Sequence, residues 1–297
     1  MKIGLLFSGQ GAQYGGMGRR LYDECPAGKA IFDRAGGEIR RWCFDGDKET
    51  LTETRITQPA IYTVSMAAWA AFEEAIAREL RAEDVEIAGA AGFSLGEYAA
   101  YTAAGVIGDF ETGLAIVRKR GEFMSEAGRH PDGAPRGAMA ALMGAREAAL
   151  RSVEAAKGKD VLEAVNFNAP NQTVAAGDAE AVERLKVCGK AAGLKVIPLH
   201  VSTAFHTPIM IPAAENLRRF LTPFAFGAPR VPVYSNVTGK DVLDGKPENV
   251  ALDAWIRERM AEQAMRPVYW QETIENMFGD GIRVFVEFGP GRALTKL

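Results

Sequence analysis

The sequence predicts an α/β protein in which one α/β domain is interrupted by a smaller inserted domain. Short apolar runs alternate with longer helical stretches along the chain, which is typical of α/β folds. The stretch at 128–137, GRHPDGAPRG, has the glycine and proline content of a boundary. At ~150 residues per domain, the 297 residues allow about two domains.

The first part of the chain predicts two strands and three clear helices. Each strand is a short apolar run that stops at a turn signal, and the first helix keeps one apolar stripe. The strands are expected at 3–7 and 85–93, and the helices at 58–79, 95–104 and 110–127.

The middle part reads strand, helix, strand, strand, helix, strand. The strands are expected at 138–143, 161–167, 172–176 and 195–199, and the helices at 146–156 and 179–192. This βαββαβ order is that of a ferredoxin-like unit. We therefore place an inserted subdomain at 129–201 and the interrupted larger domain at 1–128 and 202–297.

The α/β alternation then resumes to the end of the sequence. Helices are expected at 208–220, 252–265 and 270–278, and strands at 231–234 and 283–287.

Composition excludes several classes of protein. The formal net charge of -3 gives no overall positive electrostatic potential that would attract nucleic acid or an anionic membrane. The three cysteines form no CxxC pair and there are only three histidines, so we expect no disulfide framework and no metal site. We find no signal peptide and no run of ~18 apolar residues. A cytoplasmic monomer is expected.

Gly92, Ser94 and Gly96 fit the G-x-S-x-G pattern of a nucleophile elbow. Such a turn between a strand and a helix exposes the serine hydroxyl and places the Leu95 amide beside a developing oxyanion. The alternative is a glycine-rich structural turn, which the preceding apolar strand and the following helix disfavour.

A glycine-rich loop follows the first strand and reads GQGAQ from Gly9. Two glycines around Gln10 would let amide groups approach a substrate oxygen, so Gln10 is a candidate oxyanion donor. A solvent loop is the alternative. A phosphate cradle is disfavoured because no Gly-Lys-Ser/Thr follows.

Two further side chains remain open on residue type alone. His206 fits a catalytic base and a structural histidine about equally well. Arg120 belongs to the basic run at 118–120, which more often is a solvated helix end; successive side chains on a helix point ~100° apart, so only one of the three can face a pocket.

Several motifs, taken together and in order, resemble one family. They are GQGAQYGGMG at 9–18, GFSLGEYAAYTAAGVI at 92–107, VRKRGEFM at 117–124, NFNAPNQTVAAG at 166–177, VSTAFHTPIM at 201–210, VPVYSNVTG at 231–239 and VEFGPGRALT at 286–295. The chain resembles the malonyl-CoA:acyl carrier protein transacylases and the related acyltransferases of fatty acid and polyketide synthases. This resemblance implies an α/β-hydrolase-like domain with a ferredoxin-like insert.

The resemblance implies a ping-pong reaction with malonyl-CoA and acyl carrier protein as partners. A serine takes the malonyl group from coenzyme A and passes it to the phosphopantetheine thiol of the carrier protein. Ser94 matches the nucleophile, His206 the general base, and Gln10 with the Leu95 amide the oxyanion hole. No cofactor is implied beyond the coenzyme A thioester and the carrier's own arm.

Other positions match the substrate pocket of that family. Arg120 matches the arginine that binds the malonate carboxylate, and Asn168 an asparagine at the edge of the cleft that a simple turn would also explain. Phe205 fits the pattern of malonyl-selective members. Phe93 departs from the family's usual histidine, which puts turnover and acyl selectivity in question.

The resemblance assigns no acid behind the histidine. Instead, Gln263 matches a residue whose main-chain carbonyl orients the imidazole. We expect no carboxylate within ~3.2 Å of His206 Nδ1. The carboxylates that could be considered each have a structural explanation; they are Asp178, Glu180, Glu215 and Glu287.

Three other functions compete with the transferase. One is an editing acyl hydrolase of the same family, and another is a patatin-like esterase with a Ser-Asp dyad, for which Asp132 before Gly133 is a faint candidate. Arg120 argues against both, since a lipase has little use for a carboxylate-binding arginine. A catalytically silent docking module is disfavoured because the nucleophile, base and oxyanion candidates are all present.

Overall fold

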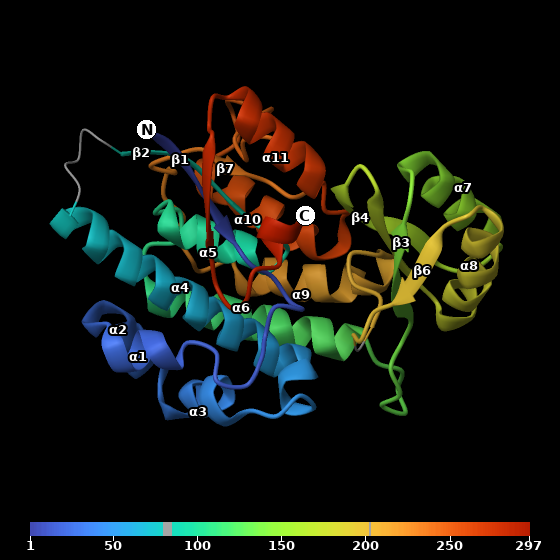
Figure 1. The fold of residues 1–297 in the computed structure, drawn as a ribbon, viewed down its shortest axis with the longest axis horizontal. Helices are drawn as coiled ribbons and strands as arrows, with labels where there is room; N and C mark the ends of the chain where they lie inside the picture. Colours follow the sequence, from blue (N-terminus) through green and yellow to red (C-terminus); the bar gives the residue numbers. More distant parts are fainter. Residues whose placement is uncertain (80–84, 202) are drawn as a thin grey trace.

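The structure, a computed structural model, describes residues 1–79, 85–201 and 203–297. Within these ranges the chain forms two sheets, each with its own helices, and they lie beside each other along the longest axis (Figure 1). The fold is mixed α/β, as predicted. The predicted domain boundary at residue 202 lies outside the described residues.

The larger sheet is parallel and has the order β7-β2-β1-β8. Its strands are β1 (Lys2–Phe7), β2 (Glu86–Gly92), β7 (Val233–Tyr234) and β8 (Val284–Phe288). The strand predicted at 231–234 is shorter than expected, since only its last two residues pair with β2.

Both faces of this sheet are buried, which explains the continuous apolar runs in its strands. Leu5 and Phe7 pack into the cluster formed with the helices on one face. Leu6 and Ala91 point to the other face and contact the cluster that contains Trp270 of α11 (Trp270–Gly279). Figure 1 shows α4 (Thr54–Glu79) and α6 (Phe110–Ala127) on one side of the sheet and α11 on the other.

Five of the other described helices of the larger part correspond to predicted ones, whereas the three helices between residues 19 and 45 were not individually predicted. Together they are α1 (Arg19–Glu24), α2 (Pro26–Ala35), α3 (Gly37–Asp45), α4 (Thr54–Glu79), α5 (Gly96–Ala103), α6 (Phe110–Ala127), α9 (Ile211–Phe220) and α10 (Leu252–Glu262), with single 3-10 turns at Thr50–Thr52, Pro208–Met210, Gln263–Met265 and Leu294–Lys296.

Three helix boundaries differ from the sequence expectation by three residues or more. Helix α9 begins at Ile211 rather than 208, because Pro208–Met210 form a 3-10 turn. Helix α4 begins at Thr54 rather than 58, so Pro59 lies inside it and the hydrogen bond to the Arg55 carbonyl is missing there. Helix α10 ends at Glu262, and residues 263–265 tighten into a 3-10 turn, a common way for a helix to end.

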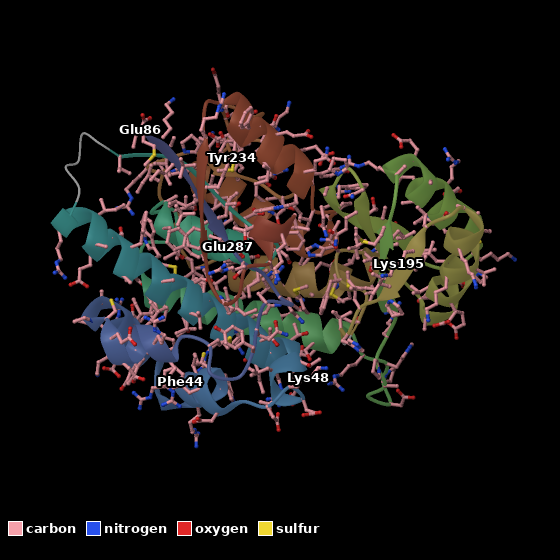
Figure 2. All side chains as sticks on the ribbon, in the orientation of Figure 1. Phe44, Lys48, Glu86, Lys195, Tyr234 and Glu287 are labelled. Atoms are coloured by element: carbon pink, nitrogen blue, oxygen red, sulfur yellow. The ribbon has the colours of Figure 1, made fainter. Side chains whose placement is uncertain are left out.

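The smaller part of the molecule contains all the strands and helices predicted for the middle of the chain, and its strands form the smaller sheet. Its strands β3 (Ala138–Met143), β4 (Leu162–Ala169), β5 (Gln172–Gly177) and β6 (Lys195–Pro198) have the order β4-β5-β3-β6 and pair antiparallel. Helices α7 (Arg146–Lys157) and α8 (Ala179–Ala191) contribute to a core of their own. Figure 2 shows Lys195 on this sheet and Glu287 on the larger one.

The two parts are joined where β4 meets the chain before α11. Phe167 N donates to the Val268 carbonyl at 2.9 Å, and Val268 N donates to the Val165 carbonyl at 2.8 Å. The Phe167 ring stacks on Tyr269 at 5.1 Å, and the Arg146 guanidinium lies 4.8 Å over its centroid. The smaller sheet is thus fixed beside the larger one.

The register of the larger sheet brings two loops together. Phe7 pairs with Gly92 of β2, so the chain leaves both strands at the same carboxyl edge. A Cβ at Gly9 would lie 2.2 Å from the Phe93 carbonyl oxygen, so only glycine permits this approach. The candidate oxyanion loop and the candidate elbow are therefore neighbours.

None of the helices in the described ranges combines the length and the apolar character that crossing a membrane requires.

Candidate active site

Ser94 lies on a strained turn between β2 and α5. Its φ is +49°, and among the described non-glycine residues only His206, at +62°, is also positive. A Cβ at Gly92 would lie 1.9 Å from the Gly96 carbonyl carbon, so the turn closes only with glycine there. This is the geometry that the G-x-S-x-G pattern predicts.

His206 and Ser94 form a hydrogen-bonded pair. Ser94 Oγ is 2.8 Å from His206 Nε2. On the other side of the ring, Nδ1 lies 3.0 Å from the Gln263 carbonyl oxygen and 2.9 Å from the Arg266 carbonyl oxygen. Both of these groups only accept, so Nδ1 carries the proton and Nε2 is free to accept one from the serine.

The predicted contact with the Gln263 carbonyl is confirmed, and two main-chain carbonyls occupy the place where a triad would have an acid. Two of the carboxylates considered above make other contacts: the carboxylate of Glu287 accepts from Leu294 N and Thr295 N, and that of Asp178 from Val161 N. Asp132 accepts from Ala134 N in its own exposed turn.

Burial, together with the positive charge of Arg120, lowers the pKa of His206 to about 4, although the hydrogen bonds to the two carbonyls oppose the shift. The imidazole is therefore neutral at pH 7. Its role as a base depends on proton transfer from a group already in contact with Nε2.

Arg120 is fully buried beside the nucleophile. Its Nη2 donates to Ser94 Oγ at 3.2 Å and to Gln263 Oε1 at 2.9 Å, and Nη1 donates to Gln58 Oε1 at 2.9 Å. Its Nε is buried with no hydrogen-bond partner in residues 1–79, 85–201 and 203–297. Its hydrogen-bond partners among the described residues are neutral oxygens, and no carboxylate there pairs with it.

The basic run around Arg120 divides as helix geometry predicts. Arg118 donates to Glu38 and Lys119 pairs with Glu122, both at the surface. Arg120 is 1% exposed and faces the site. One of three successive side chains points inward.

Two predicted oxyanion donors lie at the mouth of the elbow. The Leu95 amide precedes the first turn of α5 and has no acceptor among the described residues, as is usual for the first N–H groups of a helix. The Gln10 side chain donates from Nε2 to Thr54 Oγ1 at 3.3 Å. It lines a cavity that Ser94 also lines.

A cavity of about 690 Å³ opens at Ser94 and is walled by both parts of the molecule. Phe93, Phe205 and Asn168 line it, as predicted for substrate contacts. The Phe93 ring packs edge-on against Trp270 at 5.5 Å. The Oδ1 atom of Asn168 is buried and has no hydrogen-bond partner in the part of the chain that the structure describes. Other lining residues include Gln13, Tyr14, Lys48, Gln58, Met124, Met139, Asn166, Gln172, Leu199 and His200.

Sequence reasoning missed four contributors to the site: Gln58, Glu97, Asn236 and the Arg266 carbonyl. Gln58 lies in the apolar stripe of α4, where nothing marks it as a partner of Arg120. Glu97 and Asn236 lie inside motifs that were recognised, GFSLGEY and VPVYSNVTG, but the motif alone gave neither a role. A main-chain carbonyl leaves no signal in residue type.

Comparison with known proteins decides the family. The acyl transferase domain model matches residues 5–296. The chain is 39% identical to the malonyl CoA-acyl carrier protein transacylase of Bacillus subtilis, over 100% of this chain and 89% of that protein. The chain belongs to this family of acyltransferases.

Solved structures of members have the same fold as this acyltransferase. A malonyl-transacylase in complex with its type II polyketide synthase acyl carrier protein is 35% identical with a TM-score of 0.89, covering 100% of this chain and 92% of that one. An acyl carrier protein S-malonyltransferase from Vibrio cholerae is 36% identical with a TM-score of 0.86 over 100% and 92% of the two chains.

Proposed function

We propose that this acyltransferase moves a malonyl group from malonyl-CoA to the phosphopantetheine thiol of acyl carrier protein through a malonyl ester of Ser94. The observation that carries the substrate is Arg120, a fully buried cation 3.2 Å from the nucleophile that forms no ion pair with a carboxylate among the residues the structure describes. A buried charge needs an opposite charge, and the free carboxylate of a malonyl group supplies one. The names of the relatives support the same donor and acceptor.

The first half-reaction begins with the dyad. As Ser94 Oγ attacks the thioester carbonyl, its proton passes to His206 Nε2, 2.8 Å away. The oxyanion of the tetrahedral intermediate accepts hydrogen bonds from the Leu95 amide and Gln10. His206 then returns the proton to the sulfur of the departing coenzyme A, which leaves malonyl-Ser94.

The second half-reaction runs the same steps in reverse with a new thiol. His206 takes the proton of the carrier's phosphopantetheine thiol, the sulfur attacks the ester carbonyl, and the proton goes to Ser94 Oγ as the ester bond breaks. No cofactor takes part, because the thioester is already an activated acyl donor. Neutral carbonyls behind His206 suffice for the same reason.

The strand orders support a finer description of the fold. We assign the parallel sheet to an α/β-hydrolase-like domain at 1–128 and 202–297, and the antiparallel sheet to a ferredoxin-like subdomain at 129–201. The order β4-β5-β3-β6 with two crossover helices supports the second assignment. The three cysteines are free thiols, which supports a reducing compartment such as the cytoplasm.

Intact-protein mass spectrometry tests the function. Malonyl-CoA should add one malonyl group to the wild type and none to Ser94→Ala. When holo carrier protein is then added, the malonyl group should move from the enzyme to the carrier protein. Acetyl-CoA is the matched donor that lacks the carboxylate. A labelled peptide without Ser94 would contradict the mechanism, and release of the adduct as free malonate in preference to transfer would favour the editing hydrolase.

A further inference from the structure

A buried polar cluster lies directly beneath the dyad and takes no part in the proton transfers. It consists of Glu97, Asn236 and the side chain of Gln263, which are 0%, 0% and 1% exposed. Buried polar groups reduce stability unless their hydrogen bonds are satisfied, so a fully buried carboxylate in this position calls for an explanation.

Asn236 bridges the strained turn that carries the nucleophile. Its Oδ1 accepts from Ser94 N at 2.7 Å, and its Nδ2 donates to the Gly92 carbonyl at 2.7 Å. The two contacts hold the residues on either side of Phe93 and leave the Ser94 amide occupied. A serine with a φ of +49° keeps that conformation only where its surroundings impose it.

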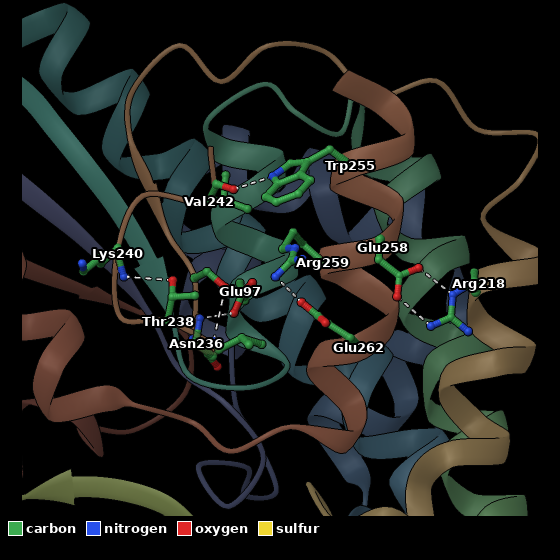
Figure 3. Close-up of polar contacts among 12 residues, drawn as sticks. Glu97, Arg218, Asn236, Thr238, Lys240, Val242, Trp255, Glu258, Arg259 and Glu262 are labelled. Atoms are coloured by element: carbon green, nitrogen blue, oxygen red, sulfur yellow. Dashed lines mark hydrogen bonds and ion pairs between the residues drawn. The ribbon is translucent and has the colours of Figure 1, made fainter. Parts of the chain in front are cut away.

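Glu97 holds Asn236 in turn. Its Oε2 accepts from Asn236 N at 2.8 Å, a contact visible in Figure 3. Its Oε1 accepts from Tyr101 Oη at 2.9 Å. Burial raises the pKa of Glu97 to about 7, although these donors and Arg120 favour the charged form.

Glu97 also fixes which way the Gln263 amide points. Gln263 Nε2 donates to Glu97 Oε2 at 3.3 Å and to the Ser94 carbonyl at 2.6 Å. Its Oε1 therefore faces Arg120 Nη2, at 2.9 Å. Reversing the amide would set a donor against Arg120 and an acceptor against the Ser94 carbonyl.

We propose that Glu97 and Asn236 are positioning residues for acyl transfer. Asn236 holds the Ser94 backbone so that Oγ lies within reach of His206, and Glu97 fixes both Asn236 and the Gln263 amide so that Arg120 stays beside Oγ. Neither side chain is among those that line the substrate cavity. The inference deepens the proposed function and rests on it only for the malonyl readout.

The first test removes the bridge and compares it with a matched deletion. Asn276 also donates from Nδ2 to one main-chain carbonyl, that of Gly239 at 2.9 Å, but away from the dyad. We expect Asn236→Ala to slow single-turnover malonylation roughly 30- to 100-fold with KM for malonyl-CoA nearly unchanged, the scale of a misplaced reacting group. Asn276→Ala should acylate at the wild-type rate.

The second test separates hydrogen-bond acceptance from charge at Glu97. Glu97→Gln and Glu97→Met are both neutral and similar in length, but only glutamine can accept from Asn236 N. We expect Glu97→Gln to acylate within about threefold of wild type and Glu97→Met to be slower by on the order of 30-fold. This pair keeps the inference testable if Asn236→Ala does not fold.

Phenylmethylsulfonyl fluoride gives a readout that needs no malonyl substrate, because its rate of ester formation reports the reactivity of Ser94 alone. The sulfonylation rates of the variants should follow the same order as their malonylation rates. Equal rates for glutamine and methionine at 97, or wild-type sulfonylation by folded Asn236→Ala, would overturn the inference. A wild type that is sulfonylated but never malonylated would instead contradict the proposed function.

Discussion

Arg120 affects both halves of the dyad in the free enzyme. Its guanidinium donates to Ser94 Oγ and its charge lowers the pKa of His206. A malonyl carboxylate bound to Arg120 would neutralise that charge, and the imidazole would then regain basicity. The substrate group that is recognised is thus also the group that favours proton transfer to His206.

This coupling predicts the pH dependence of a variant without the charge. Burial, the larger cause of the low pKa of His206, remains in Arg120→Met, but loss of the charge should raise that pKa above about 4, so the acid limb of acetyl transfer moves to higher pH. Malonyl transfer should fall roughly 30- to 150-fold, which is about 2–3 kcal/mol, while acetyl transfer at pH 8 is equal or improved. Single-turnover rates with both donors from pH 4 to 8 check this; an unmoved acid limb would contradict it.

Glu97 and His206 should make stability depend on pH with opposite signs. His206 titrates at about 4 when folded and 6.5 when unfolded, so its contribution to the free energy of unfolding rises with pH between those values. Glu97 titrates at about 7 when folded and 4.5 when unfolded, so its contribution falls as pH rises through that window. In the wild type the two largely cancel.

Single substitutions should expose the two contributions. Relative to wild type, Glu97→Gln should gain stability as pH rises from 4.5 to 7, whereas His206→Gln should lose its relative advantage over the same range. Each change is on the order of 3 kcal/mol across the full window between the folded and unfolded pKa values. Urea unfolding at pH 4.5, 5.5, 6.5 and 7.5 measures it. Parallel curves for the two variants would show that neither pKa is perturbed as described.

At the scale of secondary-structure elements, the site is formed by loops that follow the ends of the parallel strands. The sequence could predict the elbow and the GQGAQ loop because strand, glycine turn and helix are local signals. It could not predict Asn236, because a side chain far along the chain supplies the bond to Ser94 N, nor the Arg266 carbonyl, because every residue has one. The start of α4 was predicted four residues late, and the helix continues through Pro59 despite the missing hydrogen bond.

Gly9, in the loop that follows β1, is required for the two loops to meet. In Gly9→Ala the new Cβ would be 2.2 Å from the Phe93 carbonyl oxygen, so the elbow must shift. We expect a loss of at least about 2 kcal/mol in the free energy of unfolding, the scale of overpacking, and a slower acylation of Ser94. Urea unfolding and sulfonylation rates measure both effects.

Gly37→Ala is the matched control for that substitution. A Cβ there meets nothing within 4 Å, and the residue begins helix α3. Its stability should be unchanged or higher by a few tenths of a kcal/mol, about the effect of a helix-favouring change at an unstrained position. If both alanines had the same effect, contact with Phe93 could not be the cause.

At the scale of the whole molecule, the dyad belongs to the larger part, whereas both parts wall the substrate cavity. Ser94, His206 and Arg120 lie outside the smaller sheet, whereas that sheet contributes Asn166 and Asn168 to the cavity wall. The junction between the parts therefore sets the shape of the cavity without touching the dyad.

Tyr269→Leu tests this division, because it removes the ring that stacks on Phe167 at 5.1 Å and keeps the main-chain bonds of the junction. The lost aromatic contact is worth about 0.5–1.5 kcal/mol. We expect the two walls to separate more readily, so KM for malonyl-CoA and for holo carrier protein should rise by roughly three- to tenfold. Sulfonylation of Ser94 should stay at the wild-type rate, since nothing near Oγ has changed.

Phe278→Leu is the control. Phe278 lies near the other end of helix α11, whose N-cap is Tyr269. It is 53% exposed and contacts Arg283 rather than the smaller sheet. The substitution should leave both KM values unchanged. A fall in the sulfonylation rate of Tyr269→Leu with unchanged KM would mean that the junction supports the dyad instead of the cavity. Substrate binding would then depend on the larger part alone.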